Sequence, residues 1–319
     1  MRPRCVVVAA AAIAMVLALR PIRARATPAA GGQDVAPTPT FHATTDAVAV
    51  DVSVRVGTRV ITGLKAADFT VLDNGVRQQI VDVSYAKLPI DVTVAFDVSG
   101  SVTGALLDGL RRATVQLMHD LGKTDRLRLL LFGLPVRRVV DFTTDVAAVE
   151  RAIQSAVSMG GTSLYDAMSV ALISATPRDR RQLIMFFTDG GENFSVTDDA
   201  ALLDVARRTR ATVTLVMPMA GPGTAVTALL PRQHLISLVA SETGGSTLFT
   251  TMQPPTFGLT AGLTTVLTEV FRNALEVFRS SYVVYYVPQG VDRAGVHTLK
   301  VSVPTRGATV QARRGYVGG

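Results

Sequence analysis

Five oxygen-bearing side chains have the types and spacing of a divalent-cation site. Asp97, Ser99 and Ser101 occupy alternate positions directly after an apolar run, so one carboxylate and two hydroxyls can point to one place. Asp189 follows a second apolar run, and Thr162 precedes an apolar helical pattern. All five supply hard oxygen ligands, and none is His or Cys. This set suits Mg²⁺, which prefers octahedral oxygen coordination and tends to retain waters.

The same residues taken singly also have structural interpretations. Asp97 suits a strand end, and Ser101 and Thr162 suit helix N-caps. Asp189 suits a turn. Their order along the chain, each at the end of a strand or the start of a helix, favours one shared metal site over separate structural roles.

The segments that must position these side chains alternate between strands and helices. Apolar strand-like runs occupy residues 90–96, 127–132, 183–187 and 213–217. The third run is apolar throughout, as expected for a central parallel strand covered on both faces. Apolar residues recur at helical spacing over 106–117, 149–157, 164–172 and about 263–279. The alternation predicts an α/β fold with a doubly wound, mainly parallel sheet, in which ligands bind beyond the carboxyl ends of the strands.

Shorter strand patterns flank this region on both sides. Valines alternate with other residues over 48–56, and Asn74-Gly75 between two extended segments is a strong hairpin signal. The extended segments after the helical stretch are 282–287, 299–303 and 310–317. Neither flank is long enough to bury a core alone, so we expect the two to pair into one smaller β-sandwich-like subdomain.

The positive charge of the chain is concentrated at its N-terminus. The 319 residues carry a net charge of +7, but five arginines precede residue 27 without any Asp or Glu. Removing these five charges leaves +2, which says little about partners. Hydrophobic residues at 48% and charged residues at 18% exclude a largely disordered chain.

Residues 1–26 have the pattern of a signal peptide. A basic start precedes an apolar run over 5–19, and Ala24-Arg25-Ala26 offers small residues for cleavage before Thr27. An uncleaved membrane anchor is the alternative, because arginines directly after the apolar run are unusual in a signal peptide. The single cysteine, Cys5, lies in this segment, so no disulfide is expected in the mature protein.

The sequence resembles the von Willebrand factor type A domain, whose metal-ion-dependent adhesion site has the pattern Asp-x-Ser-x-Ser with a separate Thr and a separate Asp. The matching residues are Asp97, Ser99, Ser101, Thr162 and Asp189. The resemblance covers about residues 90–279. The flanks, through 69–75 and 313–316, are similar to those of exported bacterial proteins related to this domain. The resemblance implies a Rossmann-like fold, protein binding in cell adhesion and Mg²⁺, with Mn²⁺ or Ca²⁺ as alternatives.

The predicted regions are a signal peptide (1–26), a linker (27–40), an N-terminal β segment (41–88), a type A domain (89–279) and a C-terminal β segment (280–319) that pairs with 41–88. The predicted function is an exported, periplasmic or extracellular module that binds a partner's Asp, Glu or other carboxylate through Mg²⁺. Partner specificity is expected in the rim loops 190–197 and 221–230. The alternative is an envelope scaffold whose metal only stabilises the fold. The membrane is a partner only if residues 1–26 remain attached.

Catalysis has weaker support than binding. None of the four histidines adjoins the metal residues, and His119 and His297 are expected at the surface. Glu192 is the best carboxylate for a general base, but we expect it to be a loop residue near the rim. Gly-x-Ser-x-Gly and the lysine of a phosphate-binding loop are absent from the sequence. We therefore expect no enzyme activity, with a metal-dependent hydrolase as the less favoured alternative.

Nucleic-acid binding is not expected either. The basic residues include the run 178–181 and the arginine pairs at 111–112, 137–138, 207–208 and 313–314. They are dispersed and interleaved with acids, so they are expected on solvated faces of helices and strand ends.

Overall fold

The computed structural model describes residues 47–86, 88–158, 160–174, 177–220, 231–252 and 260–319. The chain divides into two compact units, 1–42 and 43–319, and every described residue belongs to the second. The predicted signal peptide 1–26, the linker 27–40 and the rim loop 221–230 lie outside the described residues. No helix in the described ranges is both long enough and apolar enough to cross a bilayer.

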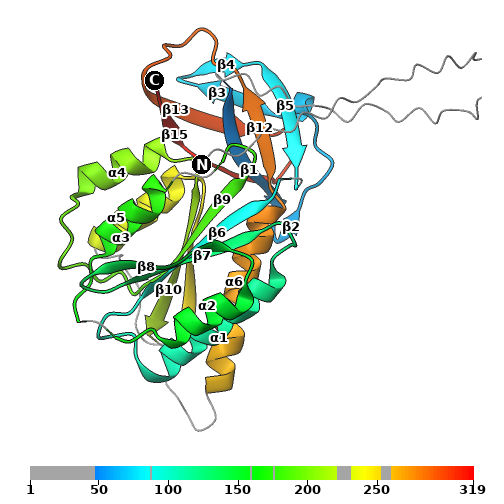
Figure 1. Cartoon of the computed structure of the whole chain (residues 1–319). Helices are drawn as coiled ribbons and strands as arrows, with labels where there is room; N and C mark the ends of the chain where they lie inside the picture. Colours follow the sequence, from blue (N-terminus) through cyan, green and yellow to red (C-terminus); the bar gives the residue numbers. More distant parts are fainter. Residues whose placement is uncertain (1–46, 87, 159, 175–176, 221–230, 253–259) are drawn as a thin grey trace, which may run out of the picture. The chain divides into compact units, whose positions relative to one another are not determined.

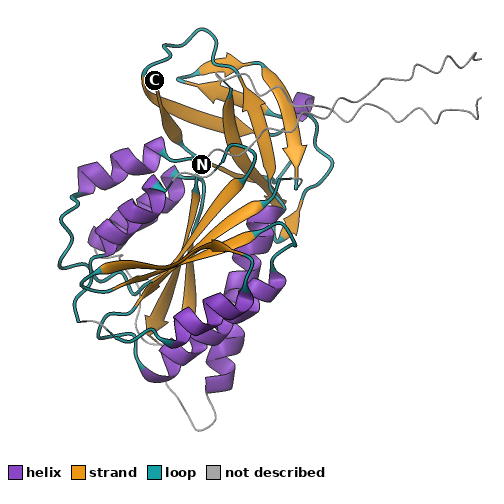
Figure 2. Ribbon diagram, viewed as in Figure 1, coloured by secondary structure: helices purple, strands orange, loops and turns teal. Residues whose placement is uncertain are grey.

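A six-stranded sheet forms the centre of the described unit (Figures 1 and 2). Its strands are β6 (Ile90–Asp97), β7 (Arg126–Phe132), β8 (Val136–Thr143), β9 (Arg181–Phe187), β10 (Thr212–Ala220) and β11 (Thr247–Met252). They lie in the order β11-β10-β9-β6-β7-β8. All neighbours are parallel except β7 and β8. The predicted mainly parallel sheet is confirmed, with β8 and β11 as strands that the sequence did not predict.

Helices cover both faces of this sheet (Figure 2). One face packs against α1 (Gly104–Asp120), α2 (Val146–Gln154) and α6 (Thr260–Arg279). The other packs against α3 (Leu164–Ile173), α4 (Asp199–Arg208) and α5 (Pro231–Glu242). The helix α2 ends three residues before its predicted end, and Val157 beyond it is 64% exposed.

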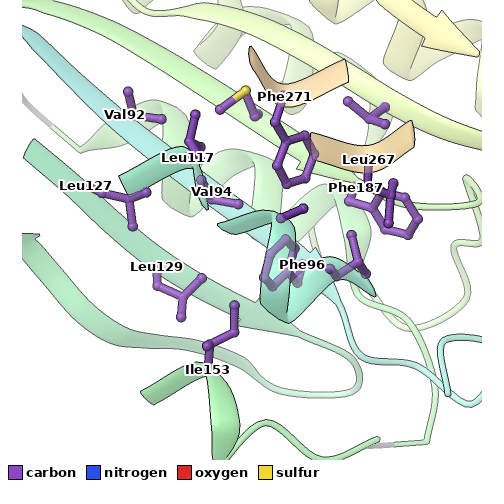
Figure 3. Packing of buried hydrophobic residues seen from close by; sticks show 14 of the residues in the cluster. Val92, Val94, Phe96, Leu117, Leu127, Leu129, Ile153, Phe187, Leu267 and Phe271 are labelled. Atoms are coloured by element: carbon purple, nitrogen blue, oxygen red, sulfur yellow. The ribbon is translucent and has the colours of Figure 1, made fainter. Parts of the chain in front are cut away.

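The alternation of side chains along β6 explains why both faces are apolar. Val92, Val94 and Phe96 lie on the face of α1 and α6, where the ring of Phe96 stacks against that of Phe271 (Figure 3). Ala95, between them, belongs to the cluster on the opposite face. Burial of apolar surface on both faces fixes β6 at the centre of the sheet.

The two flanks form a pair of antiparallel sheets. One has the order β14-β1-β12-β5 with β2 on β1, and the other has the order β15-β13-β3-β4. The strands of the N-terminal flank are β1 (Val48–Val56), β2 (Arg59–Val60), β3 (Thr70–Asp73), β4 (Val76–Gln78) and β5 (Ile80–Tyr85). The strands of the C-terminal flank are β12 (Tyr282–Tyr286), β13 (Gly295–Ser302), β14 (Thr309–Ala312) and β15 (Gly315–Gly318). A short 3-10 helix, η1 (Ala66–Asp68), precedes β3. The sheets share one apolar core. The predicted pairing of the flanks is confirmed.

The predicted hairpin is present, but its second arm divides. Asp73 pairs with Val76 across a turn in which Asn74 and Gly75 have φ angles of 46° and 82°. These positive angles suit the twist of a two-residue hairpin. The run after the turn separates into β4 and β5, which belong to different sheets, and the predicted run 310–317 likewise separates into β14 and β15.

A buried carboxylate organises the flank core. Asp73 Oδ2 accepts hydrogen bonds of 2.9 Å from the hydroxyls of Tyr286 and Tyr316, and its Oδ1 lies 2.7 Å from His297 Nδ1. His297 is 1% exposed and stacks on the ring of Tyr316. The prediction of a surface position for His297 is wrong, because the alternation of β13 places it on the buried face with Leu299. His119 is exposed, as predicted.

Two arginines expected on solvated faces are buried. Arg181 Nε donates to Asp51 Oδ1 (2.7 Å) and its Nη2 donates to the carbonyl of Phe278 (2.9 Å). Arg313 donates to the carbonyls of Arg207 and Thr209 at 2.9 and 2.8 Å. The expectation is wrong for these residues because each guanidinium lies between the flank sheets and the α/β part and makes the hydrogen bonds that join them.

Candidate metal site

The predicted ligands gather at the carboxyl edge of the central sheet. Asp97 is the last residue of β6, and Ser99 and Ser101 lie in the turn between β6 and α1. Asp189 follows β9, the parallel neighbour of β6. Because the carboxyl ends of parallel neighbours meet at one edge, the two carboxylates come from segments far apart in sequence to the same place.

Direct hydrogen bonds join this group. Ser101 Oγ donates to Asp189 Oδ2 at 2.8 Å, and the Oγ atoms of Ser99 and Ser101 lie 3.2 Å apart. The backbone N–H of Ser99 donates to Asp97 Oδ1 at 2.9 Å, which closes the turn that presents both hydroxyls. The structure therefore brings four of the five predicted residues into one hydrogen-bonded chain.

Thr162 lies beside this chain, two residues before α3 begins. Its side chain is 5% exposed, and its N–H donates to the Asn193 side-chain oxygen at 2.8 Å. A Cβ atom on Gly191 would lie 3.1 Å from Asp189 Oδ1 and 3.8 Å from Thr162 Oγ1. Gly191 thus lets the turn after Asp189 pass close to Thr162, and all five predicted residues lie at one edge of the sheet.

The two carboxylates differ in their surroundings. Asp97 is fully buried, and its Oδ2 accepts a 3.0 Å hydrogen bond from Thr188 Oγ1. Burial raises the pKa of the Asp97 carboxyl, the hydrogen bonds from Ser99 and Thr188 oppose that rise, and the charge of Asp189 adds to it. Asp189 is partly exposed. Two negative charges at such an edge are stabilised by a cation.

The donor chemistry fits a hard cation. The site combines two carboxylates with three hydroxyls, and among the described residues no three His, Cys, Asp or Glu side chains gather as metal ligands. Hydroxyl and carboxylate oxygens suit Mg²⁺ bound partly through water. The buried Asp97 and the exposed Ser101 leave the edge open on the solvent side only.

Sequence reasoning missed the residues that hold this edge in place. Thr188 donates to Asp97 and accepts from the N–H of Gly190 at 3.0 Å. Gln233 of α5 donates to the carbonyl of Asp189 at 3.2 Å. Thr188 could have been found from the sequence, because it lies directly before the predicted ligand Asp189. Gln233 is 44 residues from Asp189, and no local pattern indicated that it would contact the site.

Glu192 is part of the loop that follows β9, as predicted, and it is buried. One carboxylate oxygen accepts from the N–H groups of Phe194 and Ser195 at 3.0 and 2.9 Å. The other accepts from Ser195 Oγ at 2.7 Å and from the N–H of Tyr165, in the first turn of α3, at 2.9 Å. Through these hydrogen bonds, the Glu192 carboxylate connects the rim loop to α3.

Residues 92–192 match the family model described as von Willebrand factor type A domain. The chain carries a von Willebrand factor type A domain. The matched residues contain most of β6, all of β7 and β9, and all five predicted ligands.

Curated relatives of the type A domain are similar over a minor part of their length. Inter-alpha-trypsin inhibitor heavy chain H4 of Sus scrofa is 26% identical over 129 residues, which are 37% of this chain and 14% of that protein. An uncharacterised protein of Synechocystis is 28% identical over 120 residues, which are 36% of this chain and 28% of that protein. The type A domain thus spans well under half of these relatives.

Among solved structures, the von Willebrand factor type A protein of Catenulispora acidiphila is similar in fold. It has 11% sequence identity and a TM-score of 0.47, and the alignment covers 87% of this chain and 75% of that chain.

Proposed function

We propose that this chain is a non-catalytic, exported protein-binding module whose type A domain holds Mg²⁺ through Asp97, Ser99, Ser101, Thr162 and Asp189. Mn²⁺ and Ca²⁺ are alternatives to Mg²⁺. The partner would supply an Asp, Glu or other carboxylate.

The observation that carries this proposal is the hydrogen-bonded chain from Asp97 through both serines to Asp189. In this chain, hard oxygens from two separate loops, the turn between β6 and α1 and the loop after β9, lie within hydrogen-bond distance of one another. A set of caps and turns with unrelated structural roles would have no need to converge on one another. The match to the type A family over residues 92–192 adds support for a binding role.

Each residue of the site has its own part in this proposal. Asp97 and Asp189 supply the negative charge, and the two serines and Thr162 supply neutral oxygens. When bound, Mg²⁺ would supply positive charge toward the solvent side. The start of α1, close to the serines, adds the positive end of a helix dipole, which also favours an incoming carboxylate.

The first test is metal-dependent stabilisation. Saturating Mg²⁺ is expected to raise the melting temperature of the full chain, because a ligand at about one hundred times its Kd stabilises by about 2.7 kcal/mol. Asp189→Ala is expected to lose this rise. Asp292→Ala, an exposed acid in the flank, is the matched control and should keep it. An equal rise for Asp97→Ala and wild type would refute the metal assignment.

The second test concerns the partner. Immobilised wild-type protein is expected to capture a partner from envelope extract with Mg²⁺ and to release it with EDTA, and Asp189→Ala should capture none. Partners that stay bound after chelation, while the melting temperature falls, would instead support a scaffold in which the metal only stabilises the fold.

Mass measurement of the mature N-terminus tests export, with cleavage before Thr27 as the expected result.

A further inference from the structure

Two adjoining cavities lie beside the end of α4, near the amino ends of the parallel strands. Their volumes are about 240 and 290 Å³, and both are lined by Ala49, Arg178, Arg208 and Arg210. Strand β9 begins at Arg181, a lining residue of the first cavity, so the cavities are at the sheet edge opposite to the metal site. We call the two cavities together the arginine groove.

The lining of the groove is strongly basic. Arginines converge on it from four places: the start of β9 and the segment before it, the end of α4 and the residues after it, the loop before β13, and the segment between β14 and β15. They are Arg178, Arg180, Arg181, Arg207, Arg208, Arg210, Arg293 and Arg313. Asp51 is the one Asp or Glu among the described lining residues. The fold therefore gathers basic residues that are dispersed in the sequence.

Some of these arginines also have acidic partners. Arg181 pairs with Asp51 at 2.7 Å, and both belong to the buried junction with the flank. Arg208 pairs with Asp204 at 2.7 Å, but both side chains are more than half exposed, so this pair contributes little and can open. Arg180 pairs with Asp91 at 2.6 Å and Arg207 with Glu242 at 3.3 Å. The ion pairs among the described residues thus set four acids against the eight arginines that line the groove.

Arg313 offsets the negative potential at the C-terminal end of α4. Its guanidinium donates to the carbonyls of Arg207 and Thr209, at the C-terminal end of α4. The carbonyls at a helix C-terminus carry partial negative charge, and a cation there offsets it. The end of α4 therefore does not neutralise the exposed arginines next to it.

The exposed arginines are close enough to affect one another. Burial lowers the pKa of the Arg210 guanidinium, and the positive charge of Arg178 lowers it further, while the negative charge of Asp51 opposes both. Like charges held together in this way are stabilised by an anion between them.

We propose that the arginine groove binds a phosphate-bearing anion through Arg178, Arg208 and Arg210. The planar guanidinium group makes paired hydrogen bonds to phosphate oxygens. Each cavity is just below the range of about 300 to 1,000 Å³ for ligand pockets, which suits a phosphate group with a small substituent. The source of the phosphate is either a soluble ester or a phospholipid headgroup. This site is separate from the metal edge and does not depend on its function.

The test uses pyrophosphate as the probe, with the full chain in EDTA so that the metal site plays no part. Calorimetry at low ionic strength is expected to give saturable binding. Arg178→Gln/Arg210→Gln should weaken it at least about ten-fold. Arg137→Gln/Arg138→Gln removes the same charge from exposed positions on β8 and should change it less than about two-fold. Equal weakening in both double variants would overturn the proposal.

Two further measurements complete the test. Arg178→Lys/Arg210→Lys retains the charge without the guanidinium fork, and it is expected to bind with intermediate affinity, which would distinguish specific recognition from misfolding. Sedimentation with phosphatidylglycerol vesicles, against phosphatidylcholine vesicles, distinguishes the two sources. Groove-dependent binding to phosphatidylglycerol alone assigns a lipid headgroup, and binding to pyrophosphate alone assigns a soluble phosphate. Absence of both refutes the site.

Discussion

Asp73 is the residue on which the flank core depends most. It is fully buried, and its two oxygens serve the hydroxyls of Tyr286 and Tyr316 and the imidazole of His297. A buried donor that loses its acceptor costs about 1 to 3 kcal/mol. One carboxylate thus satisfies polar groups from three strands of the C-terminal flank.

Asp73→Ala is therefore expected to lower the free energy of unfolding by about 3 kcal/mol or more, because three buried groups lose their shared partner at once. Urea denaturation of the full chain measures this loss. Asp292→Ala, exposed in the C-terminal flank, should stay within about 0.5 kcal/mol of wild type. A loss below about 1 kcal/mol for Asp73→Ala would show that the three groups find other partners.

Three of the five predicted site residues have a signal that is local in the sequence. Asp97, Ser99 and Ser101 lie within one turn, so their spacing alone indicated a common target, and the structure brings them to the edge where Thr162 and Asp189 lie. Their role as metal ligands stays a prediction.

The surroundings of other residues depend on contacts across the whole chain. His297 was expected at the surface because nothing near it in sequence points to Asp73, 224 residues away. The gathering of arginines in the groove could not be predicted for the same reason: no local pattern connects Arg178 with Arg293.

At the scale of the elements, Asp91 joins three neighbouring strands at their amino ends. Its carboxylate, on β6, pairs with Arg126 at the start of β7 and with Arg180 just before β9, each at 2.6 Å. Burial by itself raises the pKa of Asp91, but the hydrogen bonds and charges of both arginines outweigh it and lower the pKa overall.

Asp91→Asn is expected to destabilise the protein by about 3 kcal/mol at neutral pH, because it leaves two partly buried arginines without their carboxylate. Since the folded pKa is lowered, this stability is present above the ordinary pKa of 3.8 and is lost as the pH falls through the lower folded value. Urea denaturation of wild type and variant should therefore give a constant difference from neutral pH to about pH 4, and a smaller one below it.

Asp141→Asn is the control for this prediction. Asp141 is 66% exposed on β8 and pairs weakly with Arg138 at 3.6 Å, so its loss should cost less than about 0.5 kcal/mol at every pH. A difference between wild type and Asp91→Asn that does not shrink in acid would contradict the assigned direction of the pKa shift.

The central elements were predictable and the edge elements were not. The strands β6 and β9 are buried along their whole length. Residues 183–187 of β9 are continuously apolar, and β6 is apolar except at Asp91, Thr93 and Asp97. The missed strands, β8 and β11, lie at the two edges of the sheet, and β8 is only partly buried. An edge strand packs less apolar surface, and its hydrophobic pattern is correspondingly weaker.

At the scale of the whole described unit, the N-terminal and C-terminal flanks are interleaved. Strand β12 lies between β1 and β5, and β13 lies between β3 and β15. Neither flank sheet is complete without strands from both ends of the chain. A size argument predicted that the flanks would pair, but the partner of each strand could not be predicted because register depends on the assembled core.

Deletion of residues 282–319 is therefore expected to unfold residues 47–86. Hydrogen exchange measures this directly: β1 and β3 should lose protection, while β6 and β9 keep it and act as the internal control. Continued protection of β1 in the truncated chain would show that the N-terminal flank folds alone, and loss of protection in β6 would show that the α/β part depends on the flank.

The interleaved flank also has a consequence for the order in which the protein can fold. Tyr316 donates its hydroxyl to an acceptor 243 residues earlier. The strands of the N-terminal flank therefore meet their C-terminal partners only after the α/β part has been synthesised. Pairing over such separations is slow, because a long loop must close before any contact is gained. Until then the valine-rich β1 has only the two-residue β2 as a local partner, and the rest of β1 is an open edge of the kind that associates with other chains. Closure of the flank therefore requires that β12, β13 and β15 have been synthesised.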